Sequence, residues 1–257
     1  MSVPSTPLVA RLGRDAELGA GDVALLDHMT RNATMVPADR QLQSEGDEPQ
    51  VLHVILDGLA CRYKILADGR RQITAFLVPG DLCDFHVFLL PRVDDNVATL
   101  APSLVASVPR QEVEAALAER PVLARAFWSS LLRDVSILRE WLVNVGRRSA
   151  YERMAHLLWE LYLRHAAVGK VSEGAFHLPL TQADLADALG LSTVYVNKTI
   201  TRLRASGIIE TDRRQIRVLR PEELSMIAGS EGGYLCEGGA AVKEAMGGFR
   251  GGQLRRL

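Results

Sequence analysis

Between Thr34 and Val108 the hydrophobic residues come in short runs, separated by turns that contain glycine. Asp57-Gly58 and Asp68-Gly69 each follow one of these runs, and Asp-Gly between alternating runs is a strong hairpin signal. The predicted strands cover residues 51–56, 59–66, 72–78, 96–100 and 104–108. Several short strands at roughly ten-residue spacing are typical of an all-β sandwich or roll.

After Pro109 the spacing becomes helical, and we expect a short helix over residues 110–119 and a longer one that begins at Pro121. On the longer helix, apolar residues alternate at intervals of four and three, which is the a/d pattern of a two-stranded coiled coil. These residues are Ala124, Trp128, Leu131, Val135, Leu138, Leu142 and Val145. The strict period favours a second copy of the chain as partner, while the alternative is packing on the chain's own strands. Gly146 is expected to break this helix, and another is expected over residues 147–164.

Residues 178–209 contain two shorter helical patterns joined by a turn of small residues. Thr181 and Asp184 have the spacing of a capping box for the first helix, and Ser192 suits the cap of the second. Gly190 supplies the positive φ that a sharp turn requires. The turn and both caps coincide, which favours a helix-turn-helix over an ordinary two-helix hairpin.

The second of these helices, residues 193–205, has one apolar and one polar face. Its inward residues are Val196, Ile200 and Leu203, and its outward residues are Thr193, Val194, Asn197, Lys198, Thr201 and Arg202. Short polar groups, one methyl-bearing side chain and two cations suit a DNA major groove, although such charges are also common on solvated helix faces. Residues 208–210 and 215–219 then predict a β-hairpin wing, with Arg213, Arg214 and Arg217 available for phosphates.

Charge is distributed unevenly along the chain. Residues 147–220 hold 12 Lys and Arg against 7 Asp and Glu, whereas residues 1–146 hold 14 against 19. A basic module on an acidic body is expected when only one domain meets nucleic acid. The sequence predicts no membrane span and no signal peptide, and three scattered cysteines predict neither disulfides nor a zinc site, so we expect a cytoplasmic protein.

A β-roll, a long helix and a C-terminal winged helix-turn-helix, in that order, resemble the Crp/Fnr family of bacterial transcription regulators. The resemblance covers roughly residues 22–220 and includes Gly46-Asp47, Leu56-Asp57-Gly58 and Pro79-Gly80-Asp81. It implies an α+β fold with an N-terminal, jelly-roll-like β-roll. The expected parts are a flexible arm (1–20), the β-roll sensor domain (21–120), a dimerisation helix (121–145), the winged helix-turn-helix domain (146–222) and a glycine-rich disordered tail (223–257).

The resemblance also implies a sequence-specific regulator that is a homodimer on a near-palindromic site, with double-stranded DNA and RNA polymerase as partners and no membrane. Expected base contacts are Thr193, Val194, Asn197 and Lys198. Expected phosphate contacts are Thr181, Gln182, Ser192, Tyr195, Thr201, Arg202, Arg213 and Arg214. The expected dimer seam is Trp128, Leu131, Val135, Leu138, Leu142 and Val145. Family members place an arginine and a glutamate where Thr193 and Val194 stand, so a different half-site is expected.

The sensor domain departs from family members that bind cyclic AMP through a Gly-Glu and an Arg-Ser or Arg-Thr pair. Residues 82–97 lack the Gly-Glu, and Val93-Asp94 stands near the place of the pair. Asp94 and Asp95 would repel a phosphate, and Arg92 is a candidate substitute. We therefore expect no cyclic nucleotide, although a cyclic-nucleotide-responsive regulator is one alternative.

Other cofactors are not expected either. Iron–sulfur members need four cysteine ligands, and this chain has no cysteine before Cys61. His53 and His86 are candidates for haem ligands, and Cys61 and Cys83 for a thiol sensor, but structural roles are the more common ones. A cupin-like enzyme would need more histidines on neighbouring strands, so we expect no enzyme and no metal. A small-molecule- or protein-binding module without DNA function is the remaining alternative, and the salt dependence of DNA binding would distinguish it.

Overall fold

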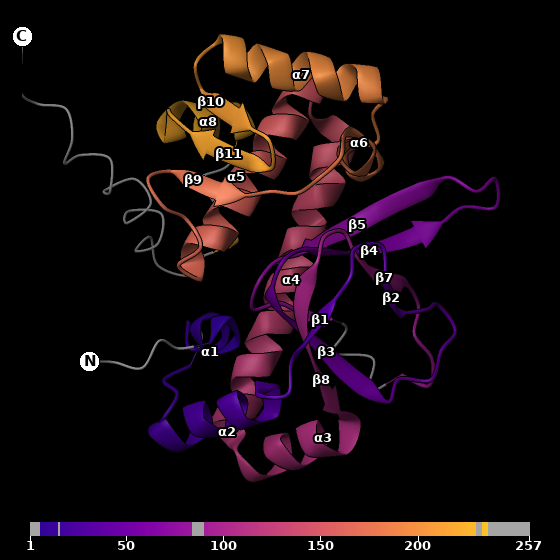
Figure 1. Ribbon diagram of the computed structural model, residues 1–257, viewed down its shortest axis with the longest axis vertical. Helices are drawn as coiled ribbons and strands as arrows, with labels where there is room; N and C mark the ends of the chain where they lie inside the picture. The colour runs from indigo at the N-terminus through magenta and orange to yellow at the C-terminus, as the bar shows by residue number, and fades with distance from the viewer. Residues whose placement is uncertain (1–5, 15, 84–89, 230–232, 236–257) are drawn as a thin grey trace, which may run out of the picture. The chain divides into compact units, whose positions relative to one another are not determined.

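The computed structural model describes residues 6–14, 16–83, 90–229 and 233–235 (Figure 1). The chain divides into two compact units, residues 1–135 and 136–257. The boundary lies within the long helix α4, Pro121–Arg147. The sequence instead suggests a dimerisation helix, residues 121–145, as a separate part between the two domains. Among the helices of the described residues, none is both long enough and apolar enough to cross a membrane.

The first unit is built on two four-stranded antiparallel sheets, which confirms the predicted β-rich domain. One sheet has the order β1-β8-β3-β6 and the other β2-β7-β4-β5. The strands are β1 Thr34–Val36, β2 Gln41–Gln43, β3 Val51–Asp57, β4 Ala60–Ile65, β5 Arg71–Leu77, β6 Leu82–Cys83, β7 Asn96–Thr99 and β8 Ser103–Pro109. Ile55, Leu77 and Val97 belong to one buried apolar cluster of this unit, which includes residues of both sheets.

A second cluster of the first unit brings helices onto the sheet of β3 and β8. It includes Leu12 of α1 (Pro7–Leu12), Leu26 of α2 (Ala20–Thr30), Val113 of α3 (Arg110–Glu119) and Phe127 of α4. The expectation of a flexible arm over residues 1–20 is therefore wrong for α1. Thr6 caps this helix and Pro7 begins it, and Leu8, Val9 and Leu12 are buried.

Helix α1 is held in place by close packing and by charge. A Cβ atom at Gly80 would lie 2.6 Å from the carbonyl oxygen of Pro7, so only glycine allows this approach. The buried Arg11 guanidinium pairs with Asp81 and, at 2.6 Å, with Asp134 of α4, and its Nε donates to Ser130. These contacts are long-range in sequence, which is why a local reading of residues 7–12 missed them.

Helix α4 has two apolar faces rather than one. The buried face consists of Leu123, Ala126, Phe127, Ile137 and Trp141, none of which belongs to the predicted dimer seam. Three seam residues are exposed: Trp128 (50%), Leu138 (55%) and Leu142 (75%). The helix continues through Gly146 to Arg147, so the predicted break at Gly146 is wrong, and the chain turns at Arg148 before Ser149 caps the next helix.

The second unit contains the predicted helix-turn-helix and wing. Its elements after α4 are α5 Ala150–Ala167, β9 Ala175–His177, α6 Gln182–Leu189, α7 Thr193–Ala205, β10 Ile209–Asp212, β11 Gln215–Val218 and α8 Pro221–Ala228. The sheet order is β10-β11-β9, so a third strand, β9, joins the two predicted strands of the wing. Helix α8 also corrects the predicted disordered tail for residues 223–228, whereas residues 236–257 lie outside the described residues.

Candidate nucleic-acid interface

The turn between α6 and α7 has the geometry that its sequence predicts. The backbone N–H of Asp184 donates to Thr181 Oγ1 at 3.1 Å, and Asp184 Oδ2 accepts from the backbone N–H of Thr181 at 3.0 Å. Gly190 follows α6 with φ +61°, a conformation that favours glycine. Ser192 Oγ then accepts from the backbone N–H of Tyr195 at 3.4 Å. Two capped helices are thereby joined at a fixed turn.

Helix α7 packs against its own unit through Val196 and Leu203, which are fully buried. Ile200, the third residue of the predicted stripe, is partly buried. Thr199 was not predicted to face inward, but it is buried because its Oγ1 hydrogen-bonds the helix backbone at Tyr195 and Val196. A hydroxyl that bonds to its own helix backbone can be buried at little cost in free energy. The sequence alone does not reveal this, because a polar residue is normally expected to face water.

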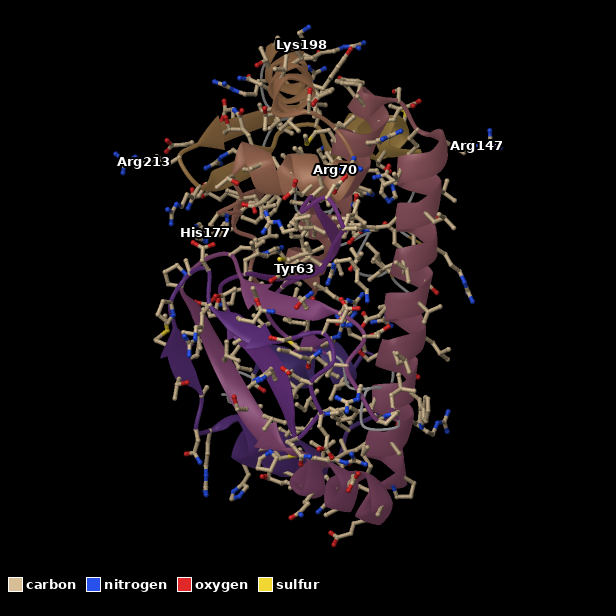
Figure 2. All side chains as sticks on the ribbon, turned by 90° about the vertical axis from the view of Figure 1, so that its right-hand side faces the viewer. Tyr63, Arg70, Arg147, His177, Lys198 and Arg213 are labelled. Atoms are coloured by element: carbon tan, nitrogen blue, oxygen red, sulfur yellow. The ribbon has the colours of Figure 1, made fainter. Side chains whose placement is uncertain are left out.

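The four predicted base-contact residues, Thr193, Val194, Asn197 and Lys198, are all exposed on α7. So are the predicted phosphate-contact residues Thr181, Gln182, Ser192, Tyr195, Thr201, Arg202, Arg213 and Arg214. Val194 is 61% exposed, so its methyl groups are accessible to a ligand. Figure 2 shows Lys198 at the outer side of α7.

Three contacts orient the polar side chains of this face. Lys198 Nζ lies 5.6 Å from the ring centroid of Tyr195, one turn earlier on α7. Thr201 Oγ1 donates to Asn197 Oδ1 at 3.2 Å. Arg202 stacks at 4.1 Å on Tyr151 of α5, a contact within the range of cation–π attraction. Tyr151 carried no sequence signal for this role, because its partner is far away in the chain.

Arg153 of α5 is a second residue that sequence reasoning missed. Its Nη1 donates to the carbonyl oxygen of Leu189 at 3.0 Å, and its Nε donates to that of Arg148 at 2.9 Å. One guanidinium thus satisfies carbonyls at the end of α6 and just beyond the end of α4. Cations are favoured at helix C-termini, so Arg153 ties the start of α5 to the helix-turn-helix.

The wing places two arginines at its tip. Asp212 pairs with Gln215, so Arg213 and Arg214 form the turn between β10 and β11. Arg213 has φ +50° and points away from the hairpin in Figure 2. Arg217, predicted to be available, instead contacts the Glu173 carbonyl at 3.1 Å and its carboxylate at 3.6 Å. This pair is solvent-exposed and therefore weak, so a phosphate can compete for Arg217.

In the β-roll, Arg62 and Arg92 both have partners within the chain. Arg62 lies opposite Val97 in the sheet, so it shares the face that carries the core, and its Nε is 3.0 Å from Asp95 Oδ2. Asp95 is therefore already neutralised by an arginine. Arg92, the candidate phosphate ligand, donates to the carbonyl oxygen of Gly46 at 2.8 Å.

Three of the four candidate sensor residues, His53, Cys61 and Cys83, lie among the described residues. His53 Nδ1 lies 3.0 Å from Ser107 Oγ, and burial lowers the pKa of His53 from its usual value. Cys61 and Cys83 are buried, and His86 lies outside the described residues. Within those residues, no group of three or more His, Cys, Asp or Glu side chains is arranged to hold a metal ion.

Comparisons with known proteins agree with this geometry. Residues 152–227 match the family model of the Crp-like helix-turn-helix domain, and residues 33–120 match that of the cyclic nucleotide-binding domain. A probable transcriptional activator of Rhizobium leguminosarum bv. viciae is 31% identical over 190 residues, which are 74% of this chain and 78% of that protein. The nitrogen fixation regulation protein FixK of Bradyrhizobium diazoefficiens is 30% identical over 213 residues, 83% of this chain and 88% of that protein.

A solved structure gives the same result. That of FixK2 from Bradyrhizobium japonicum superimposes with a TM-score of 0.68 at 27% identity, and covers 76% of this chain and 96% of that one. The similarity extends over both units, because the sequence relatives and this structure each cover most of the chain.

Proposed function

The chain belongs to the Crp/Fnr family of transcription regulators, and from this premise we propose that it acts as a homodimer on a near-palindromic DNA site. It is a DNA-binding transcription regulator and not an enzyme. DNA binding through α7 is supported by the exposed outer face of this capped helix, which carries two cations, short polar groups and the apolar side chain of Val194.

The proposal of a dimer rests on the exposed face of α4. The apolar side chains of Trp128, Leu138 and Leu142 are exposed, and Leu132, also on α4, is 64% exposed. Exposed apolar patches of this kind mark association surfaces in soluble proteins. Since the opposite face of the helix is already buried within its own chain, the exposed face is free for a second copy, as an a/d seam requires.

Pairing of two chains would present two α7 helices to the DNA. In helix-turn-helix dimers the two recognition helices enter successive major grooves, about 34 Å apart, on sites with two-fold symmetry. Val194 suits a thymine methyl and Lys198 suits guanine O6 or N7, whereas Thr193 cannot make a bidentate guanine contact. Arg213 and Arg214 of the wing suit flanking phosphates.

The β-roll is proposed to influence how the DNA-binding domains are oriented, and it is proposed to do so without binding a cyclic nucleotide. The ion pair of Arg62 and Asp95 supports this, because an incoming phosphate would have to compete with the Asp95 carboxylate. RNA polymerase is the proposed protein partner, since the relative from Rhizobium leguminosarum is named a probable transcriptional activator.

The test is selection of binding sites from a random pool of duplex DNA with the purified protein, with and without cyclic AMP. A two-fold-symmetric motif, enriched equally in both conditions, is the expected result. A motif without symmetry would contradict the dimer, and enrichment only with cyclic AMP would contradict the ligand assignment. A steep loss of affinity with added salt is expected if phosphates are neutralised, and a flat dependence would contradict DNA as the partner.

A further inference from the structure

The second unit contains a largely buried polar cluster centred on α5. We call it the Glu160 cluster: Trp141 of α4, His156, Glu160 and Arg164 of α5, and Tyr234 beyond α8. None of these residues belongs to the predicted DNA contacts. A buried polar cluster is costly to assemble unless its members satisfy one another, so its arrangement calls for a function.

Glu160 is the centre of the cluster, and its side chain is completely buried. Its Oε2 accepts from the Trp141 indole N–H at 2.8 Å, and its Oε1 accepts from Arg164 Nη1 at 3.0 Å. Tyr234 Oη is 3.5 Å from Oε2. The carboxylate therefore joins three segments: the last turns of α4, the middle of α5 and the chain beyond α8.

Tyr234 reaches this carboxylate because residues 233–235 return onto α5. Its ring is stacked on that of His156, with centroids 5.9 Å apart and an angle of 15° between the planes, and Leu235 beside it is buried. The His156 Nδ1 lies 3.3 Å from the carbonyl oxygen of Ala228 at the end of α8. A carbonyl only accepts, so Nδ1 carries the proton and Nε2 accepts from Tyr234 Oη at 3.1 Å.

The protonation states agree with this direction. Burial, with a smaller effect of Arg148, lowers the pKa of His156 to about 4, so its ring is neutral near pH 7. Burial, with the negative charges of Glu160 and Glu140, raises the pKa of Tyr234 well above its usual value, so its hydroxyl remains a donor. The hydroxyl thus lies between two acceptors, His156 Nε2 and Glu160 Oε2.

The same helix α5 supports the DNA-binding face. Tyr151 stacks on Arg202 of α7, and Arg153 bonds to the carbonyl at the end of α6. Whatever fixes α5 against the end of α4 therefore fixes the helix-turn-helix as well. The match to the helix-turn-helix family model ends at residue 227, before Tyr234, so the third support of Glu160 comes from a segment beyond the matched domain.

We propose that Tyr234 is a positioning residue for DNA binding, and that residues 233–235 act as a clasp. Through His156 and Glu160, the clasp holds the final turns of α4 against α5 and thereby orients α6 and α7. DNA affinity then depends on a hydroxyl that does not touch DNA. The proposal concerns the second unit alone and does not depend on how two chains pair.

Two truncations of the full chain and one point substitution test the clasp. One truncation ends after Leu235 and keeps the clasp, and the other ends after Gly229 and removes it. Tyr234→Phe removes only the hydroxyl and keeps the stacked ring. Tyr162→Phe is the matched control, because Tyr162 is also buried in α5 but lies outside the cluster, against Trp159 and Phe176. Affinity is measured by fluorescence anisotropy on the selected DNA site.

The chain that ends after Leu235 should bind as the full chain does, whereas Tyr234→Phe should bind up to about tenfold more weakly, the upper end of the effect of one part-buried hydrogen bond. The chain that ends after Gly229 should bind more weakly still. A second readout, the NMR signal of the ¹⁵N-labelled Trp141 indole, should shift in Tyr234→Phe and stay in place in Tyr162→Phe. This signal needs no DNA, so it remains informative even if selection yields no palindromic site.

Three results would overturn the proposal. The first is a folded Tyr234→Phe protein with full affinity and an unmoved Trp141 signal. The second is an equal loss of affinity in both truncations, which would assign the effect to residues 236–257. The third is a Tyr234→Phe protein whose melting temperature falls while its DNA affinity is retained, which would reduce the clasp to a stabilising contact.

Discussion

Lowering the pH from 7 to 4 should destabilise the second unit through His156. The pKa of this histidine falls from its usual 6.5 to about 4 in the folded chain, mainly because the ring is buried. In the unfolded chain the ring takes up a proton as the pH falls through 6.5, while the folded ring stays neutral until about 4. The contribution to stability is thus fully present above pH 6.5 and is lost as the pH falls towards 4.

The size of this effect follows from the difference between the two pKa values. A difference of about 2.5 units, at about 1.4 kcal/mol per unit, gives roughly 3 kcal/mol. The charges around the ring act in opposite directions, since Arg148 lowers the pKa of His156 and Glu140 raises it. The side chain is 1% exposed, so solvent screening reduces the effect little.

The assay is urea unfolding of the full chain, followed by tryptophan fluorescence at several pH values. Trp128→Phe in the background leaves Trp141 and Trp159, both in the second unit, as the fluorophores. Each measurement is paired with His156→Gln, which keeps a donor and an acceptor but does not titrate. Because other groups cancel in the difference between the two proteins, that difference should change by roughly 3 kcal/mol between pH 7 and 4. A difference that does not vary with pH would refute the assignment of a neutral, buried His156.

Three further substitutions test the DNA-binding face and the proposed dimer. Lys198→Ala should lower affinity for the selected site by about tenfold or more in anisotropy measurements, and an unchanged value would contradict α7 as the recognition helix. Leu142→Asp places a charge in the exposed face of α4 and should yield monomers in sedimentation velocity, whereas an intact dimer would move the interface elsewhere. Gly190→Val forces a β-branched residue into φ +61° and should lower the unfolding free energy by more than about 1 kcal/mol, as denaturant titration would show.

The helix-turn-helix could be predicted because its signals are local. The caps at Thr181 and Ser192 bond to residues three positions away, and Gly190 turns the chain through its own φ. Alternation and Asp-Gly turns likewise revealed the main strands of the β-roll. These features depend on neighbours in the sequence, so their energies are present before any tertiary contact forms.

The predictions that failed depended on partners far away in the chain. The pattern of residues 7–12 does not show that Arg11 will meet Asp81 and Asp134, and without those contacts a single short helix would not persist. The tail prediction failed at α8, and local composition does not reveal that Tyr234 docks on His156.

The sequence by itself determined the main strands of the β-roll, the long helix and the helix-turn-helix, and which face of α7 meets water. Only the tertiary structure decided which of the two apolar faces of α4 is buried within the chain, because apolar residues recur at helical spacing on both. It also decided that Glu160 is stable as a buried acceptor, since a carboxylate can leave water only where donors such as the Trp141 indole and the Arg164 guanidinium converge on it.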